Sequence, residues 1–196
     1  MIHLKEIIRN FLRNTKWCNT NEKEQNLQGR LYSFFTNLED LGYIVEMETS
    51  VKDNHLAKVL NKNSFKKTEI DLLIYKHDFS EKYAVELKWF YSPGFHYYDR
   101  FKEFQEDCLF AKQLVQSGFD EACSVVVVNP HGITNANNNR KNFDLLMNFG
   151  FDKYNSIPRK LRYNNNEDIE FSWETTPGLS SDEKVYYYII SFSNLD

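Results

Sequence analysis

Ionisable side chains interrupt two strongly apolar segments of the chain, Glu69–Tyr75 and Tyr83–Phe90. Asp71 lies within the first segment, and Glu86 and Lys88 lie within the second. Both segments are predicted to be β-strands, and the short link between them predicts an antiparallel hairpin. Because an ionised group buried without a partner is strongly destabilising, any fold that buries these strands must bring the charges together or pair them.

Strand alternation predicts where the three charges lie. Side chains alternate between the two faces of a strand, so Glu86 and Lys88 share one face of the second strand. On the first strand, Asp71 is predicted on the face opposite to Ile70, Leu72 and Ile74. A hairpin turn centred on Asp78–Phe79 puts Asp71 opposite Glu86, and one centred on Phe79–Ser80 puts it opposite Lys88. Either register brings the three charges within roughly 5–8 Å of one another on one face.

Two carboxylates this close repel each other unless positive charge lies between them. A hard divalent cation fills that role, because it takes oxygen ligands and keeps several waters. Lys88 is then predicted beside the metal-bound water. The alternative is a structural ion pair, in which Lys88 neutralises Asp71 or Glu86 on a half-exposed sheet surface.

The segment EIDLLIYKHDFSEKYAVELKW resembles the PD-(D/E)XK nuclease superfamily, whose pattern is an acidic residue on one strand and Glu-x-Lys on the next. Here these residues are Asp71 and Glu86-Leu87-Lys88, and Ile70 stands where the pattern has proline. The resemblance implies a restriction-endonuclease-like core and metal-dependent hydrolysis of phosphodiester bonds, in DNA more than in RNA. It also implies one Mg²⁺, for which Mn²⁺ can substitute, bound by Asp71, Glu86 and the Leu87 carbonyl. Lys88 would orient the attacking water.

Glu24 is a further candidate for this site. It lies on the apolar stripe of a predicted helix, with Leu27 and Leu31, so it is predicted to point toward the sheet. Members of the superfamily often carry a carboxylate on the first core helix that reaches the metal. The alternative is that Glu24 is the capping-box partner of Asn21, and Glu22 would replace it if the helix register differs.

The remaining pattern predicts an α/β fold with a mixed β-sheet flanked by helices. Length favours a single domain over 1–196, with a core over about 22–129 and a C-terminal elaboration over 130–196. Helices are expected at Met1–Asn14, Asn21–Leu41 (ended by Gly42), Tyr97–Gln116 and Asn137–Phe149. Besides the hairpin, strands are expected at Tyr43–Val51, Cys123–Val128, Phe171–Trp173 and Val185–Phe192. Lys52–Lys66 is expected to be a loop that can include a helical turn, and Asn164–Asn166 is expected to be a loop.

Charge and cysteine content limit the partners and the compartment. The net charge of −4 argues against a strongly basic binder of nucleic acid, so affinity for DNA would need a local patch. Lys62, Lys66 and Lys67, just before the Asp71 strand, are the candidate phosphate contacts, with Arg140–Arg162 as the second choice; the alternative for both is solvated surface. Three scattered cysteines suit a reducing compartment. With no signal peptide or membrane segment recognised, a cytoplasmic location and no membrane partner are expected.

Three functions follow from these patterns. The first is a nuclease, and duplex cleavage by analogy allows a homodimer. The second is a non-catalytic module of the same fold that binds nucleic acid or a partner protein. The third is an ordinary α/β protein with an ion pair on its sheet.

Overall fold

The computed structural model describes residues 2–15, 24–58, 60, 65, 67–90, 97–128, 159–164, 167–171, 174–175 and 185–194. The helices are α1 (Leu4–Asn14), α2 (Glu24–Phe35), the 3₁₀ helix η1 (Thr36–Leu41), α3 (Asn54–Ala57) and α4 (Tyr97–Gln116). The strands are β1 (Tyr43–Ser50), β2 (Glu69–Lys76), β3 (Lys82–Phe90), β4 (Glu121–Val128), β5 (Arg159–Asn164), β6 (Glu167–Phe171), β7 (Glu174–Thr175) and β8 (Tyr186–Ser193). This is the α/β fold that the sequence predicted.

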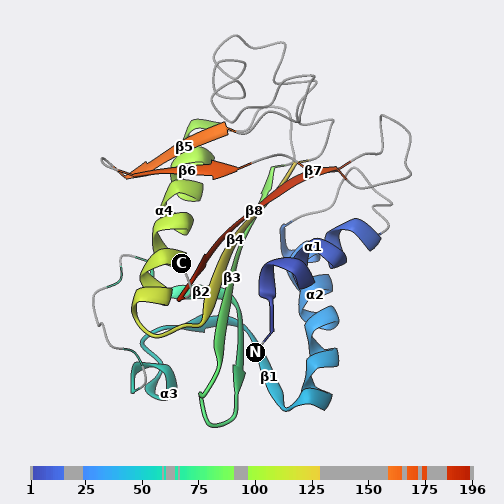
Figure 1. Cartoon of the computed structure of the whole chain (residues 1–196), viewed down its shortest axis with the longest axis vertical. Helices are drawn as coiled ribbons and strands as arrows, with labels where there is room; N and C mark the ends of the chain where they lie inside the picture. Colours follow the sequence, from blue (N-terminus) through green and yellow to red (C-terminus); the bar gives the residue numbers. More distant parts are fainter. Residues whose placement is uncertain are drawn as a thin grey trace.

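A mixed sheet of six strands forms the centre of the described structure, in the order β1-β2-β3-β4-β8-β7. Strands β1, β2 and β3 are antiparallel neighbours, whereas β3 and β4 are parallel. A parallel pair needs a crossover connection, and α4 lies in the connection from β3 to β4. Helices α1 and α2 cover one face of the sheet and α4 covers the other (Figure 1). The hairpin of β5 and β6 forms a separate two-stranded sheet beside α4.

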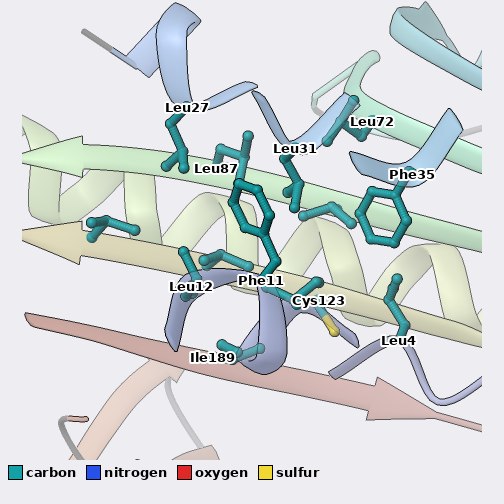
Figure 2. Close-up of a cluster of buried hydrophobic side chains, with 14 of the residues drawn as sticks. Leu4, Phe11, Leu12, Leu27, Leu31, Phe35, Leu72, Leu87, Cys123 and Ile189 are labelled. Carbon is teal, nitrogen blue, oxygen red and sulfur yellow. The ribbon is translucent and has the colours of Figure 1, made fainter. Parts of the chain in front are cut away.

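The face under α1 and α2 is a continuous apolar core. Leu4, Phe11 and Leu12 come from α1, and Leu27, Leu31 and Phe35 come from α2. All six side chains point onto Leu72, Leu87, Cys123 and Ile189 of the strands (Figure 2). The three residues of α2 are four apart, and Phe11 and Leu12 follow Leu4 by seven and eight residues, so each set lies on one side of its helix.

The opposite face is packed by α4. Phe110, Ala111 and Leu114 of the helix share a second buried cluster with small residues of the strands, Ala84 and Ala122. The two alanines are register partners across β3 and β4. Small side chains at these two positions allow α4 to pack closely against β3 and β4. The helix is thereby held close to the strand that carries Glu86 and Lys88.

The alternation along β2 is broken at Asp71. Ile70 packs with Leu73 in the cluster under α4, so the prediction that Ile70 faces the side of Leu72 was wrong. The β1–β2 ladder has partners on both sides of this point but none between Asp71 and Glu48, and Glu48 has a φ of 50°. A non-glycine residue with positive φ is uncommon and marks a local distortion, which strict period-two reasoning cannot anticipate.

The sequence predicted α1, α4, β1, β2, β3, β4 and β8 correctly to within a few residues at each end. The helix expected to reach Leu41 instead ends at Phe35 and continues as η1. Thr36 and Asn37 explain this, because their side chains donate hydrogen bonds to backbone carbonyls in the last turn (2.7 and 2.8 Å) and compete with the helical pattern. Gly42 ends the segment with a φ of 77°, as expected.

Other differences lie in the last third. Strand β5 reaches Asn164, where a loop was expected, and β7 was not predicted. The expected strand Phe171–Trp173 overlaps β6 only at Phe171. Helix α3 is the helical turn that the loop over Lys52–Lys66 was expected to allow. The predicted helix Asn137–Phe149 lies outside the described residues.

Among the described residues, no helix combines the length and the apolar character that crossing a membrane requires.

The packing predicts a large difference between two leucines. Leu31, on the side of α2 that faces the sheet, is fully buried, whereas Leu41 is 60% exposed. Leu31→Ala should lower the free energy of unfolding by about 2–5 kcal/mol, because it leaves a cavity in the core. Leu41→Ala removes the same atoms and should cost less than about 1 kcal/mol. Chemical denaturation of both variants measures the difference, and equal losses would contradict the assigned core.

Candidate functional site

The hairpin register brings the predicted residues together. Leu72 pairs with Val85 and Tyr75 pairs with Lys82, so continuing the ladder places Asp71 opposite Glu86. This is the first of the two predicted registers. The turn is closed by the Lys76 amide, which donates to the Glu81 carbonyl at 2.9 Å.

Asp71 lies where β2 parts from β3. The regular ladder between the two strands stops at the Leu72–Val85 pair. Beyond it, Asp71 Oδ2 accepts a hydrogen bond of 2.7 Å from the Leu87 amide, in place of a backbone carbonyl of β2. The Asp71 carbonyl accepts one of 2.9 Å from Gln28 Nε2, on α2. These two contacts fix the Asp71 carboxylate at the opening between the strands.

The Glu24 carboxylate also accepts a hydrogen bond from a backbone amide of β3, two residues after Leu87. Its Oε2 accepts a hydrogen bond of 3.0 Å from the Trp89 amide. The amides of Leu87 and Trp89 are two residues apart, so both lie on the edge of β3 that β2 has left. Carboxylates of Asp71 and Glu24 therefore satisfy two amides that a longer β2 ladder would have used. Glu24 reaches the sheet, as its place on the stripe of α2 predicted; its capping partner Asn21 lies outside the described residues.

Glu86 is almost completely buried, with 1% of its surface exposed. Its Oε2 forms an ion pair with the Lys67 ammonium. Its Oε1 is also buried and has no hydrogen-bond partner within the described part of the chain. Half of this carboxylate is thus unsatisfied by hydrogen bonds, which is rare for a buried oxygen and needs an explanation.

Asp107 is a buried carboxylate that the sequence reasoning missed. It lies on α4, is 2% exposed, and its Oδ1 is 2.8 Å from Lys67 Nζ. Its Oδ2 is 3.4 Å from Lys88 Nζ. The helical spacing offered a signal, because Asp107 is three residues after Phe104 and four before Ala111, on the buried side of α4. We refer to Asp71, Glu86 and Asp107 together as the carboxylate cluster.

Lys88 faces α4 from β3 and is largely buried, with 12% of its side chain exposed. Besides Asp107, its ammonium lies 3.7 Å from Glu103 Oε2, and Glu103 is 44% exposed. Lys88 therefore marks the boundary between the carboxylate cluster and solvent. Lys88 also lines the open space beside α4.

That open space is a cleft of about 470 Å³ next to the carboxylate cluster. Its lining residues are Lys67, Lys88, Glu103, Glu106, Asp107, Leu109, Phe110 and Gln113. Three of them are acidic and two are basic. A polyanion would be repelled by the acidic groups, so it fits this cleft best when additional positive charge is present.

Burial and mutual repulsion disturb the ionisation of the whole group. Burial, aided by the charge of Asp71, raises the pKa of Glu86 well above its usual range, despite the neighbouring Lys67. Burial also raises the pKa values of Asp107 and Asp71. Burial lowers the pKa values of Lys67 and Lys88, but the surrounding carboxylates outweigh it and the net shift is upward. The environment therefore favours cations and disfavours bare carboxylates, which is the electrostatic character of a cation site.

Of the three predicted substrate lysines, the structure describes Lys67. Lys67 pairs with Glu86 and Asp107, and 26% of its side chain is exposed. Lys62 and Lys66 lie outside the described residues, so phosphate binding by this stretch stays a prediction. Of the second basic stretch, Arg159–Asn164 forms β5. The side chain of Leu87 packs in the core under α2 and its amide binds Asp71, while metal binding by its carbonyl stays a prediction.

No protein-family model, curated protein or solved structure matches this chain. The interpretation of the site therefore depends on its own residues and geometry.

The raised pKa of Glu86 predicts a specific pH dependence of stability. A buried carboxyl whose pKa is higher in the folded than in the unfolded state binds more protons when folded, so stability falls as pH rises between the two values. In metal-free buffer, Glu86→Gln should remove this loss. The variant should be more stable than the wild type at pH 7, and the difference should shrink toward pH 4.5, at up to about 1.4 kcal/mol per pH unit.

Chemical denaturation across this pH range, with chelator present, measures the effect. Parallel stability curves for Glu86→Gln and the wild type would contradict the proposed electrostatics of Glu86.

Proposed function

We propose that this protein is a divalent-metal-dependent nuclease of the PD-(D/E)XK type that hydrolyses phosphodiester bonds in DNA. One observation carries the proposal: Asp71 and Glu86 come from adjacent antiparallel strands in opposed register, and Lys88, two residues after Glu86, lines a cleft together with Lys67 and Asp107. The order of elements, a helix, a three-stranded antiparallel unit, a crossover helix and a parallel strand, agrees with a restriction-endonuclease-like core.

The residues fit Mg²⁺ or Mn²⁺ by their chemistry. Mg²⁺ is commonly held by one or two protein carboxylates and keeps several waters. Asp71 and Glu86 are the carboxylates that would hold it, and the buried Glu86 Oε1 is an acceptor without a hydrogen bond from any described residue. In the described part of the chain, no three His, Cys, Asp or Glu side chains converge as ready metal ligands. The site would therefore be a two-carboxylate site completed by water.

A bound divalent ion would supply a water of lowered pKa and would stabilise negative charge on the phosphate. This chain's own residues do the rest. Asp71, fixed by the Leu87 amide and Gln28, holds its carboxylate at the strand opening. Lys88 lines the cleft and carries a positive charge where negative charge develops on the phosphate in the transition state. Glu86 is held by burial under α4, away from bulk water.

A second function is favoured by the ion pairs themselves. Lys67 and Lys88 neutralise Glu86 and Asp107 without any metal. Such a network would suit a non-catalytic module of the same fold that binds a nucleic acid or a protein. The two proposals differ in whether divalent metal binds and whether DNA is cut.

Cleavage should depend on metal, on Lys88 and on Asp71. Linear, circular and single-stranded DNA should be cut with Mg²⁺ or Mn²⁺ and left intact with chelator. Lys88→Ala should lower the cleavage rate by about 10²-fold or more, because it removes a charge that stabilises the transition state. Asp71→Asn should lower it through lost metal binding. Lys52 is exposed, so Lys52→Ala is the matched control and should keep the wild-type rate.

If no substrate is cut under any of these conditions, or if Lys88→Ala cuts as fast as Lys52→Ala, the nuclease proposal is wrong. The non-catalytic module would then be the better description.

Metal should also stabilise the folded protein. A ligand that binds only the folded state adds RT ln(1 + [L]/Kd), about 2.7 kcal/mol at a hundredfold excess over Kd. Millimolar Mn²⁺ should raise the melting temperature of the wild type, and Asp71→Asn should reduce the shift. Differential scanning calorimetry measures both. An identical metal-induced shift in the two proteins would place the metal elsewhere.

A further inference from the structure

The Lys67 ammonium is the cation most deeply engaged in the carboxylate cluster. It contacts Glu86 and Asp107 directly, and the charge of Asp71 also acts on it. A divalent ion held by Asp71 and Glu86 would lie against the same small carboxylate that Lys67 contacts, whichever of its two oxygens the ion bound. Two cations cannot share that position without strong repulsion at such short range.

We propose that Lys67 is a built-in counter-ion of the carboxylate cluster, and that a divalent metal binds by displacing its ammonium from Glu86. This inference rests on the proposed metal site and adds a residue that sets its affinity. In the metal-free protein, Lys67 keeps Glu86 from being an unpaired buried charge. In the metal-bound protein, the ion takes over this task and the ammonium moves away.

The position of Lys67 makes this displacement feasible. Lys67 precedes β2 in an irregular segment, so its side chain is not held in a strand ladder. It lines the cleft beside α4 and is 26% exposed, which gives the ammonium a route toward solvent. Asp107 can retain it after Glu86 is released, since the two groups already lie 2.8 Å apart. The Phe110 ring, 5.9 Å from Lys67 Nζ, offers a further favourable contact.

The hydrogen bonding of Glu86 also supports displacement of Lys67 by a metal ion. One ammonium pairs with Oε2, whereas Oε1 stays buried without a hydrogen bond from the described residues. A cation that brings its own bound waters could satisfy both oxygens of the carboxylate. Lys67 therefore stabilises one oxygen of Glu86, whereas a divalent ion with its waters could stabilise both.

The first test measures metal affinity by isothermal titration calorimetry with Mn²⁺ alone, without DNA. Lys67→Met removes the charge and keeps most of the length, so Mn²⁺ should bind roughly tenfold tighter than to the wild type, a size typical of groups next to a metal site. Lys67→Arg keeps the charge and should bind no tighter than the wild type. Lys52→Met, at an exposed lysine, controls for the change in net charge.

The second test uses the wild-type protein, so it does not depend on how well a variant folds. Brief labelling with acetic anhydride, read by mass spectrometry, compares the reactivity of Lys67 with that of Lys52. Saturating Mn²⁺ should raise the labelling of Lys67 relative to Lys52, because the displaced ammonium becomes accessible.

Either of two results would overturn the inference: Mn²⁺ binding to Lys67→Met that is equal to or weaker than wild-type binding, or Lys67 labelling that Mn²⁺ leaves unchanged. The nuclease proposal is tested separately by DNA cleavage. Cleavage with unchanged metal affinity in Lys67→Met rejects only the counter-ion role, whereas no metal binding in any variant rejects both proposals.

Discussion

The hydrogen bond between the Asp71 carboxylate and the Leu87 amide is the contact on which the site depends. It forms where the ladder between β2 and β3 stops, and it replaces a backbone carbonyl with a charged side chain. Opening two strands inside a sheet exposes amides that must be satisfied. Here the carboxylates of Asp71 and Glu24 satisfy them, so the distortion that creates space at the site also fixes its acidic groups.

The second constraint is charge balance in a buried place. The carboxylate cluster has three acidic groups, and Lys67 and Lys88 are the two cations that reach it from the described residues. Removing one of the two cations is costly, because carboxylates are left uncompensated, whereas Lys67 keeps Asp107 as a partner when Glu86 is neutralised. Helix α4 is part of this balance through Asp107. The crossover helix therefore contributes charge to the site, and it does more than cover the sheet.

Much of the fold and the central pair of the site were predictable because they depend on local patterns. Alternating apolar residues and a short turn determine the β2–β3 hairpin, and its register follows by counting. Glu86 was found for the same reason. Asp107 was missed although its helical spacing marked it as inward-facing. The role of Lys67 could not be predicted, because it lies in an irregular segment where no periodicity tells which way a side chain points.

The broken alternation at Ile70 is a feature that the sequence pattern could not predict. Glu48, on the neighbouring strand, adopts a positive φ opposite Asp71, and a distortion of this kind depends on tertiary contacts and leaves no mark in the pattern of β2. Gln28 was overlooked because a polar residue beside an apolar stripe is usually solvated, whereas here it binds the Asp71 carbonyl. Both features are located where the sheet departs from regular geometry.

The most direct test of the cation site is a crystal structure of the wild-type protein grown with Mn²⁺, with the metal located by its anomalous scattering. We expect one anomalous peak within coordination distance, about 2.0–2.3 Å, of carboxylate oxygens of Asp71 and Glu86, with the Lys67 ammonium moved away from Glu86. An intact Lys67–Glu86 ion pair, with no anomalous peak at the carboxylate cluster, would contradict the account.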